Sequence, residues 1–408
     1  MQVRRDVIKA RKSCRIESEV ENEISKFLEE RINAGDFPSA VYLIAEKGEI
    51  VMQDALGLAV VEPERIEAWL DAVYDMASLT KVLVTGLLMA KLVEGGELYA
   101  NDLVSKYLPE FGSEEKRGIT VSEMLTHTSH LPAWKPLYLC VSDPEMVLAE
   151  IAKTVLGRVQ NPVTYSDLNF ITLGKIIERI TGKDLDAAFT EIALGPLGLD
   201  DTGFRPLSKI SILRIAASEK GNEFEKQTCI EKGYLDHGGE NPVTASDAST
   251  GSDFRTPHSA LRDYQIWGEV HDGNANFMGG VAGHAGLFST AEETFKIAQQ
   301  FLPRFSSILK PETCKLFRTN FTPEMNEHRS FAFQLASTPE SAAGKLMSPQ
   351  SFGHLGFTGT SLWINPVKER VFILLTNRTH NHALPFVNLN AVRRRFHDLA
   401  IGQLDANS

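Results

Sequence analysis

Residues 74–96, YDMASLTKVLVTGLLMAKLVEGG, decide the fold, because here a strand-like pattern changes to a long apolar helix. From position 77 the stretch is apolar on almost every face until Glu94-Gly95-Gly96, which predicts a helix buried on all sides. Ser78 and Lys81 stand three residues apart at its first turn, so their side chains share one face. We therefore expect the Lys81 ammonium to lie beside the Ser78 hydroxyl.

The start of this helix also favours chemistry at Ser78. Free N–H groups and the helix dipole favour negative charge there, which helps an alkoxide to form. The competing interpretation is a solvent-facing serine cap followed by a surface lysine, and the four-residue motif alone favours it. Lys81, however, lies among Val, Leu and Met, where an unpaired ammonium is costly. This context favours a functional lysine.

The segments on either side of the helix predict a sheet built from both chain ends. Residues 39–60 indicate two strands joined at Lys47-Gly48, and the apolar first strand should be central. An amphipathic helix is expected before them, at residues 19–34. Further strands are expected at 330–337, 359–366 and 370–377, followed by a last helix at 387–401. Helices inserted between the two halves of a sheet make this an α+β fold.

The domain organisation follows from this pattern. We expect an N-terminal extension, residues 1–18, and one catalytic unit, residues 19–408. Its α/β part would be 19–97 and 285–408, and its mostly helical part 98–284, including a polar, turn-rich, flap-like excursion at 206–258. Within the helical part, Thr120 and Glu123 stand at capping-box spacing, and a helix should end at Gly182.

Composition restricts the class of protein. The 408 residues are 43% hydrophobic and 23% charged, as in ordinary globular chains, and the net charge of −11 disfavours nucleic acid as a partner. The four cysteines are far apart, so neither a disulfide framework nor a structural zinc site is indicated. The start lacks the apolar region of a signal peptide, and the longest apolar run, 82–90, is too short for a membrane span. We expect a cytoplasmic protein without a cofactor or metal.

Two further segments hold candidate site residues. Tyr165 precedes a helix and could act as a base, because a nearby lysine would stabilise its deprotonated form. The alternative is that Ser166 or Asp167 caps the helix while Tyr165 only packs. In FGHLGFTGTSLW, residues 352–363, three glycines suggest close approach to a ligand, and His354 could donate to a substrate carbonyl or carboxylate. The alternative here is a hairpin with bulges.

These motifs, in this order, resemble the S-x-x-K, Y-x-N and K-T-G motifs of class C β-lactamases, penicillin-binding DD-peptidases and related serine esterases of the family VIII type. The resemblance extends from about residue 20 to 400 and includes EMLTHTSHLP, GPLGLDDTGF and GGVAGHAGLFSTAEE. It implies a β-lactamase/transpeptidase-like fold, with Ser78 as the acylated nucleophile and Lys81 as base or proton relay. Tyr165 would be the second base, and the amides of Ser78 and of Phe357, after Gly356, would form the oxyanion hole.

Two departures from the family pattern bear on the substrate. Asp167 replaces the asparagine, and an ionised aspartate only accepts hydrogen bonds, which disfavours recognition of an acylamino group. His354 replaces the lysine and weakens the positive charge that would hold a carboxylate. We therefore expect a serine hydrolase that acts through an acyl-enzyme on a small ester or amide. The alternatives are a D,D-carboxypeptidase or muropeptide amidase, a β-lactamase, and a catalytically silent scaffold.

Asp167 leads to one more hypothesis. If its carboxylate approaches Lys81, it should keep the ammonium charged and leave Tyr165 as the base.

The other polar clusters are interpreted as follows. The family resemblance implies that His284 lies in a tight loop on the active-site side, with a purely structural turn as the alternative. His380 and His382 favour a solvated loop over a metal site. Residues 393–395, three arginines, favour the solvated face of the last helix.

Overall fold

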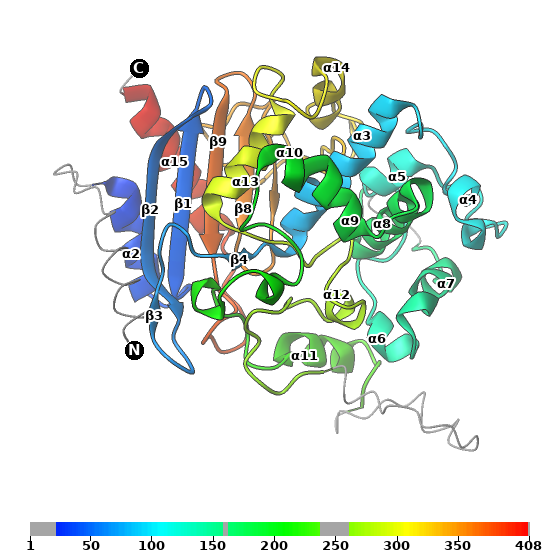
Figure 1. The fold of residues 1–408 in the computed structure, drawn as a ribbon, viewed down its shortest axis with the longest axis horizontal. Helices are drawn as coiled ribbons and strands as arrows, with labels where there is room; N and C mark the ends of the chain where they lie inside the picture. Colours follow the sequence, from blue (N-terminus) through cyan, green and yellow to red (C-terminus); the bar gives the residue numbers. More distant parts are fainter. Residues whose placement is uncertain (1–21, 158–161, 237–260, 407–408) are drawn as a thin grey trace.

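A seven-stranded sheet joins the two ends of the chain in the computed structural model, which describes residues 22–157, 162–236 and 261–406 (Figure 1). The strand order is β3-β2-β1-β9-β8-β7-β6, and every neighbouring pair is antiparallel. The strands are β1 (Ser39–Glu46), β2 (Glu49–Val60), β3 (Ile66–Glu67), β6 (Gln334–Leu335), β7 (Phe352–Leu355), β8 (Ser361–Asn365) and β9 (Arg370–Thr376). The predicted α+β class and the central position of β1 are confirmed.

One predicted strand is much shorter than expected. Of residues 330–337 only Gln334 and Leu335 pair with β7. The preceding residues turn instead, because Ala332 adopts a left-handed φ of 62° and the Ser330 N–H donates to the Phe333 carbonyl. The alternation of Phe331 and Phe333 is typical of a strand with one buried face, but here both side chains are buried in the main core without strand pairing.

Helices cover both faces of the sheet. Tyr42 and Ile44 of β1 pack in one cluster with residues of α2 (Glu23–Asn33) and α15 (Asn390–Ala406). Val41 and Leu43 point to the opposite face and belong to the main core, which includes α13 (Ala291–Ala298). Figure 1 shows α2 and α15 on the outer side of the sheet and the helical region on the other. Because successive side chains of a strand point to opposite faces, β1 contributes to both clusters, and the junction between sheet and helical region lies on the Val41 and Leu43 side.

The predicted buried helix spans the centre of that junction. It starts as a 3₁₀ turn, η1 (Ala77–Leu79), continues as a π-helical segment, η2 (Lys81–Gly86), and becomes α3 (Leu87–Gly95). Every residue of η2 is buried, and Gly96 ends the helix at a φ of 75°. The prediction of a helix buried on all sides is confirmed for residues 79–90, but Lys91 and residues 93–95 are partly or fully exposed, and the first turns are not regular α-helix.

In the described part of residues 98–284 the regular elements are helices, and most of them are short. The capping box at Thr120 and Glu123 forms, and α8 ends at Gly182 in the left-handed region. The helices are α4 (Val104–Tyr107), α5 (Val121–Leu125), α6 (Leu137–Cys140), α7 (Val147–Lys153), α8 (Asp167–Thr181), α9 (Leu185–Phe189), α10 (Gly195–Leu197), α11 (Glu223–Glu231) and α12 (Gly273–Phe277), with α14 (Pro311–Cys314) later in the chain. No helix in the described ranges is both long and apolar enough to cross a membrane.

The predicted flap at 206–258 needs correction for its first half. Residues 206–236 are packed against the body of the protein, where Glu225 and Cys229 of α11 are buried. Because most of the segment is polar, its pattern did not predict that these two residues are buried. Both contact Tyr138, which is distant in the sequence. The turn-rich remainder, 237–258, lies outside the described residues, as does the predicted extension 1–18.

Candidate active site

Ser78 follows a strained residue at the base of a pocket. Ala77 has a φ of 45°, a left-handed conformation that costs a non-glycine residue free energy. The buried Asp75 holds this conformation, because its carboxylate accepts hydrogen bonds from the N–H groups of Ala77 and His271, both at 2.8 Å. Asp75 therefore joins the backbone turn that precedes Ser78, the nucleophile candidate, to the segment around His271, which is distant in the sequence.

Lys81 is fully buried and points at Ser78. Its Nζ donates to Ser78 Oγ at 2.9 Å and to the His284 carbonyl at 3.1 Å, and it lies 2.7 Å from Asp167 Oδ1. Burial opposes the charge of Lys81, but the interactions of Lys81 with Asp167 and Tyr165 together outweigh burial, so the pKa of the ammonium is raised. The expected approach of Asp167 to Lys81, with a charged lysine as its consequence, is confirmed.

Tyr165 lies next to Lys81, but its ionisation differs from expectation. Its ring centroid is 5.0 Å from Lys81 Nζ. Burial raises the pKa of the Tyr165 phenol, and the negative charge of Asp167 raises it further against the lowering effect of Lys81. Tyr165 is therefore a neutral phenol in the resting protein, which contradicts the expectation of a stabilised tyrosinate. Burial is the largest of these effects, and the negative charge of Asp167 partly offsets the positive charge of Lys81 that would have stabilised a tyrosinate.

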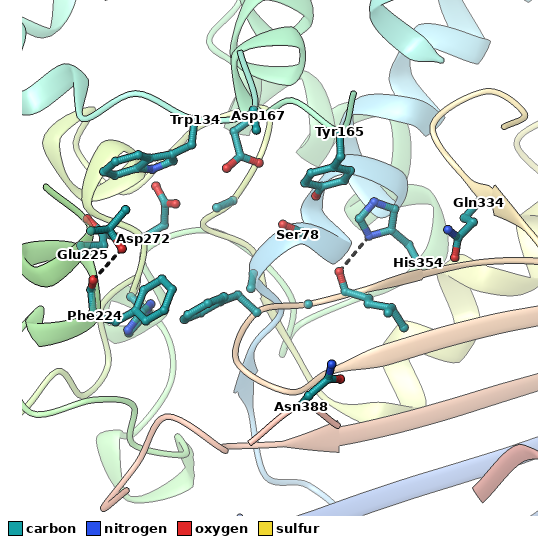
Figure 2. Close-up of a pocket in the computed structure, with 18 of the residues that line it drawn as sticks. Ser78, Trp134, Tyr165, Asp167, Phe224, Glu225, Asp272, Gln334, His354 and Asn388 are labelled. Carbon is teal, nitrogen blue, oxygen red and sulfur yellow. Dashed lines mark hydrogen bonds between the residues drawn. The ribbon is translucent and has the colours of Figure 1, made fainter. Parts of the chain in front are cut away.

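His354 is buried beside Tyr165 on β7, with ring centroids 5.7 Å apart (Figure 2). Burial, with the charges of Lys81 and Arg329, holds the pKa of His354 well below its usual value, so the imidazole is neutral. Its Nδ1 lies 2.9 Å from the Leu355 carbonyl and must donate to it, which leaves Nε2 without a proton. This tautomer contradicts the expected role of His354 as a donor to substrate.

The turn after β7 is tied directly to the segment that precedes Ser78. Thr358 Oγ1 donates to the Asp75 carbonyl at 2.7 Å, and Thr360 Oγ1 donates to the Met76 carbonyl at 3.1 Å. Gly356 is required by close packing, since a Cβ there would come within 1.9 Å of Thr360 Oγ1. The glycine is therefore explained by close packing within the protein, against Thr360 and the Met76 carbonyl, whereas the sequence pattern suggested close approach to a ligand.

The two backbone N–H groups expected to form an oxyanion hole are available. Among the described residues, neither the Ser78 N–H nor the Phe357 N–H has a hydrogen-bond acceptor in the protein. Ser78 and Phe357 line the same pocket, and unpaired donors there are what the negative oxygen of a tetrahedral intermediate needs.

A pocket of about 700 Å³ opens over Ser78 and brings together all seven predicted site residues except Lys81, which lies beneath it. Figure 2 shows Tyr165, His354 and Gln334 on one side of Ser78 and Trp134, Glu225 and Asp272 on the other. The sequence analysis missed several lining residues: Trp134, Phe224, Glu225, Asp272, Arg329, Arg378 and Asn388. They come from separate loops and helices, and no local pattern marked them.

The far side of the pocket carries a pair of interacting acids. Burial and the charge of Asp272 raise the pKa of Glu225 to about 7. Although burial opposes it, pairing with His284 at 2.9 Å lowers the pKa of Asp272. Because the His284 carbonyl also accepts from Lys81, the GGVAGHAG loop lies on the active-site side, as expected.

Two expectations for surface residues are wrong. His380 is buried, not solvated: its Nε2 accepts from the Val61 N–H and its Nδ1 donates to the Ser218 carbonyl. Arg393 is only 4% exposed, although its helix neighbour Arg395 is exposed. Both are held by segments far away in the sequence. Within the described part of the chain, no group of three or more His, Cys, Asp or Glu residues could hold a metal ion.

The fold and this arrangement of serine, lysine and tyrosine define a serine hydrolase of the β-lactamase/transpeptidase type. The chain belongs to the Beta-lactamase family, whose match covers residues 24–394.

Relatives and solved structures of similar fold carry several activities in their names. The chain is 30% identical over 388 residues to a "Putative D-alanyl-D-alanine carboxypeptidase" of Escherichia coli K12, covering 88% of this chain and 82% of the relative. A Salmonella typhimurium protein of the same name is 32% identical over 400 residues, covering 89% and 84%.

Among solved structures, the octameric penicillin-binding protein homologue of Pyrococcus abyssi has a TM-score of 0.66 at 19% identity, covering 93% of this chain and 77% of the other. A class C β-lactamase from Rhodobacter sphaeroides has a TM-score of 0.64 at 18% identity, covering 94% and 100%. A hydrolase with promiscuous acyltransferase activity has a TM-score of 0.65 at 18% identity, covering 92% and 97%. At these identities the structures establish the fold alone.

Proposed function

We propose that the protein hydrolyses small esters or amides through an acyl-enzyme on Ser78. The observation that carries the proposal is the position of Lys81 Nζ, 2.9 Å from Ser78 Oγ and 2.7 Å from Asp167 Oδ1 at the base of the pocket. A buried lysine between a hydroxyl and a carboxylate can transfer a proton from one to the other. A silent scaffold would have no need for this arrangement.

In acylation, Lys81 passes one of its protons to Asp167, and the resulting amine accepts the proton of Ser78 as Oγ attacks the substrate carbonyl. Lys81 requires this first transfer because it is already protonated in the resting protein. The neutral phenol of Tyr165 donates its proton to the leaving group and becomes a phenolate. The amides of Ser78 and Phe357 would stabilise the negative carbonyl oxygen.

Deacylation reverses these proton transfers with water. The Tyr165 phenolate accepts a proton from the attacking water, and the hydroxide adds to the acyl carbonyl. As the acyl–oxygen bond breaks, the proton held by Asp167 returns through Lys81 to Ser78 Oγ. The site thus regains a neutral serine, a neutral phenol, an ammonium and a carboxylate, and protons balance over the cycle.

The state of His354 supports an ester, or an amide without a carboxylate, as substrate. A neutral imidazole with an unprotonated Nε2 provides neither a positive charge nor a donor at this position. A β-lactam or peptide carboxylate would lack the partner that the family's lysine supplies.

D,D-carboxypeptidase activity is a second candidate because Arg378 also lines the pocket. Within the described ranges this guanidinium has no carboxylate partner; its Nε and Nη1 donate to the carbonyls of Phe357 and Val387. A substrate carboxylate could pair with its remaining donors. The names of the two bacterial relatives favour the same activity.

The test compares p-nitrophenyl butyrate, an acyl-D-alanyl-D-alanine peptide and nitrocefin as substrates for the intact protein and for Ser78→Ala. The matched control is Ser113→Ala, which removes an exposed hydroxyl. We expect ester turnover in the intact protein and the control, loss in Ser78→Ala, and labelling of Ser78 by a fluorophosphonate. Turnover of the peptide alone would favour the second candidate, whereas no turnover and no labelling would contradict both.

A further inference from the structure

Arg393 of α15 is a buried cation held almost entirely by backbone carbonyls. Its Nη2 donates to the carbonyls of Gly356 at 3.0 Å and Thr360 at 3.1 Å, and its Nη1 makes a long contact of 3.3 Å with Asn390 Oδ1. Its Nε is buried and unpartnered among the described residues, and the charged group that acts on its pKa is a second cation, Arg378, not a carboxylate. A buried charge without a counterion is expensive and requires a compensating role.

The Gly356 carbonyl belongs to the same peptide group as the Phe357 N–H. We propose that Arg393 is a positioning residue that orients and polarises this peptide, so that the Phe357 N–H becomes a stronger oxyanion donor. The inference rests on the proposed acyl-enzyme function, because only that function develops a negative oxygen beside Phe357.

Elementary electrostatics supports this role. A hydrogen bond from a cation to a carbonyl withdraws electron density from the peptide and strengthens its N–H as a donor. Burial lowers the pKa of Arg393 to about 9, so the guanidinium remains charged at neutral pH. In a buried environment its field reaches the oxyanion with little screening by solvent.

The rest of the turn is arranged to keep this peptide in place. Arg378 Nε donates to the Phe357 carbonyl at 2.7 Å, on the other side of the same residue. Thr358 and Thr360 anchor the turn to the strand end before Ser78, so the two oxyanion donors hold a fixed relation to each other. Arg378 and Arg393 also repel each other, and a negative oxygen in the pocket would relieve that repulsion.

The experiment measures kcat and KM for Arg393→Met with two esters, p-nitrophenyl butyrate and mono-p-nitrophenyl succinate, of which only the second has a carboxylate. Arg395→Met, on the exposed face of the same helix, is the matched control. We expect kcat to fall about tenfold for both esters, less than the ~10²–10³-fold loss for removing an oxyanion donor itself. KM should change by less than about twofold, and butylboronic acid, which forms a negative tetrahedral adduct with serine, should bind about tenfold more weakly.

An unchanged kcat, or a rise in KM limited to the succinate ester, would overturn the inference, since the latter result makes Arg393 a carboxylate ligand. If Arg393→Met does not fold, Arg393→Lys carries the test: one ammonium replaces the planar fork that holds two carbonyls, and kcat should fall about threefold. An unchanged kcat in that variant would also overturn it. Failure of the proposed function itself is distinguished by the Ser78→Ala result on the unmodified background.

Discussion

Two buried cations lie at the pocket that contains Ser78, and only one of them has a carboxylate partner among the described residues. Lys81 lies 2.7 Å from the carboxylate of Asp167, whereas Arg393 is surrounded by carbonyls and one amide. Both side chains are almost completely buried. A cation with a carboxylate partner can lose its proton to that partner, but an arginine held by carbonyls has no such acceptor and is far less acidic.

The difference separates two tasks that the same charge could serve. On the Lys81 side, the compensated charge allows proton transfer at the nucleophile. On the Arg393 side, the uncompensated charge provides a permanent positive field at the oxyanion position. The comparison predicts that a change at Lys81 abolishes the reaction, because proton transfer at Ser78 is lost. A change at Arg393 should only weaken the stabilisation of the negative oxygen in the tetrahedral intermediate.

The largest effect is expected from Lys81→Met, which removes the proton relay while preserving most of the buried apolar volume. Ester kcat should fall by about 10³-fold or more, because Ser78 loses the base within hydrogen-bond reach. Lys91→Met is the matched control, since Lys91 lies on the same helix, has a side chain that is 38% exposed, and interacts with Glu94 and the Ile308 carbonyl instead of with Ser78. Equal activity in both variants would show that the compensated side has no role in proton transfer.

Gly356→Ala should have the next largest effect, on the oxyanion side. The added Cβ would come within 1.9 Å of Thr360 Oγ1 and 2.8 Å of the Met76 carbonyl, so the turn must move. We expect kcat to fall about 10²-fold and the free energy of unfolding to drop by roughly 1–3 kcal/mol. Steady-state kinetics and urea unfolding measure the two quantities.

Gly402→Ala serves as its control. No atom lies within 4 Å of a Cβ at this exposed position of α15, so the protein should keep its activity. Because alanine favours a helix over glycine, the free energy of unfolding should rise by about 0.5–1 kcal/mol. If Gly356→Ala behaved in the same way, the close packing of the turn would have no catalytic consequence.

Asp167→Asn sharpens the comparison by removing the counterion of Lys81, with a smaller effect. Without the carboxylate of Asp167, the effect of burial on Lys81 is no longer offset, so the pKa of Lys81 should fall from its raised value. The limb of the kcat/KM profile that reports the free amine should therefore move to lower pH, while kcat at its optimum falls about tenfold for lack of a proton acceptor.

Profiles from about pH 5 to about pH 10 would detect the shift. Asp186→Asn, which breaks the surface pair with Arg205, should leave the profile unchanged. A profile for Asp167→Asn that superimposes on that of the intact protein would contradict the paired-charge mechanism.

The accuracy of the sequence analysis differed between these two sides for a physical reason. Ser78 and Lys81 are three residues apart on one helix, and helical geometry alone brings them together. Asp167 is singled out because it stands at the third position of the tyrosine motif in the family that the sequence resembles, and its approach to Lys81 follows from the sequence only as a hypothesis. Arg393 could not be placed in this way: it lies in a run of three arginines, and its carbonyl partners are about 35 positions earlier in the chain.

The protonation states likewise required the tertiary structure. Proximity to a lysine suggested a tyrosinate at Tyr165, but the sum of burial and the nearby Asp167 carboxylate raises its pKa instead. His354 was expected to donate, yet its contact with the Leu355 carbonyl determines the opposite tautomer at Nε2. Such states depend on the balance of several distant groups.

The sequence by itself determined the fold class, the central strand β1, the buried helix and the identity of a serine–lysine pair, because these follow from local periodicity and spacing. Only the tertiary structure decided that the Arg393 side chain is buried, which tautomer His354 adopts, and which residues from separate loops enclose the pocket. Burial and counterions are properties of the packed chain, and they arise from segments that meet only after folding.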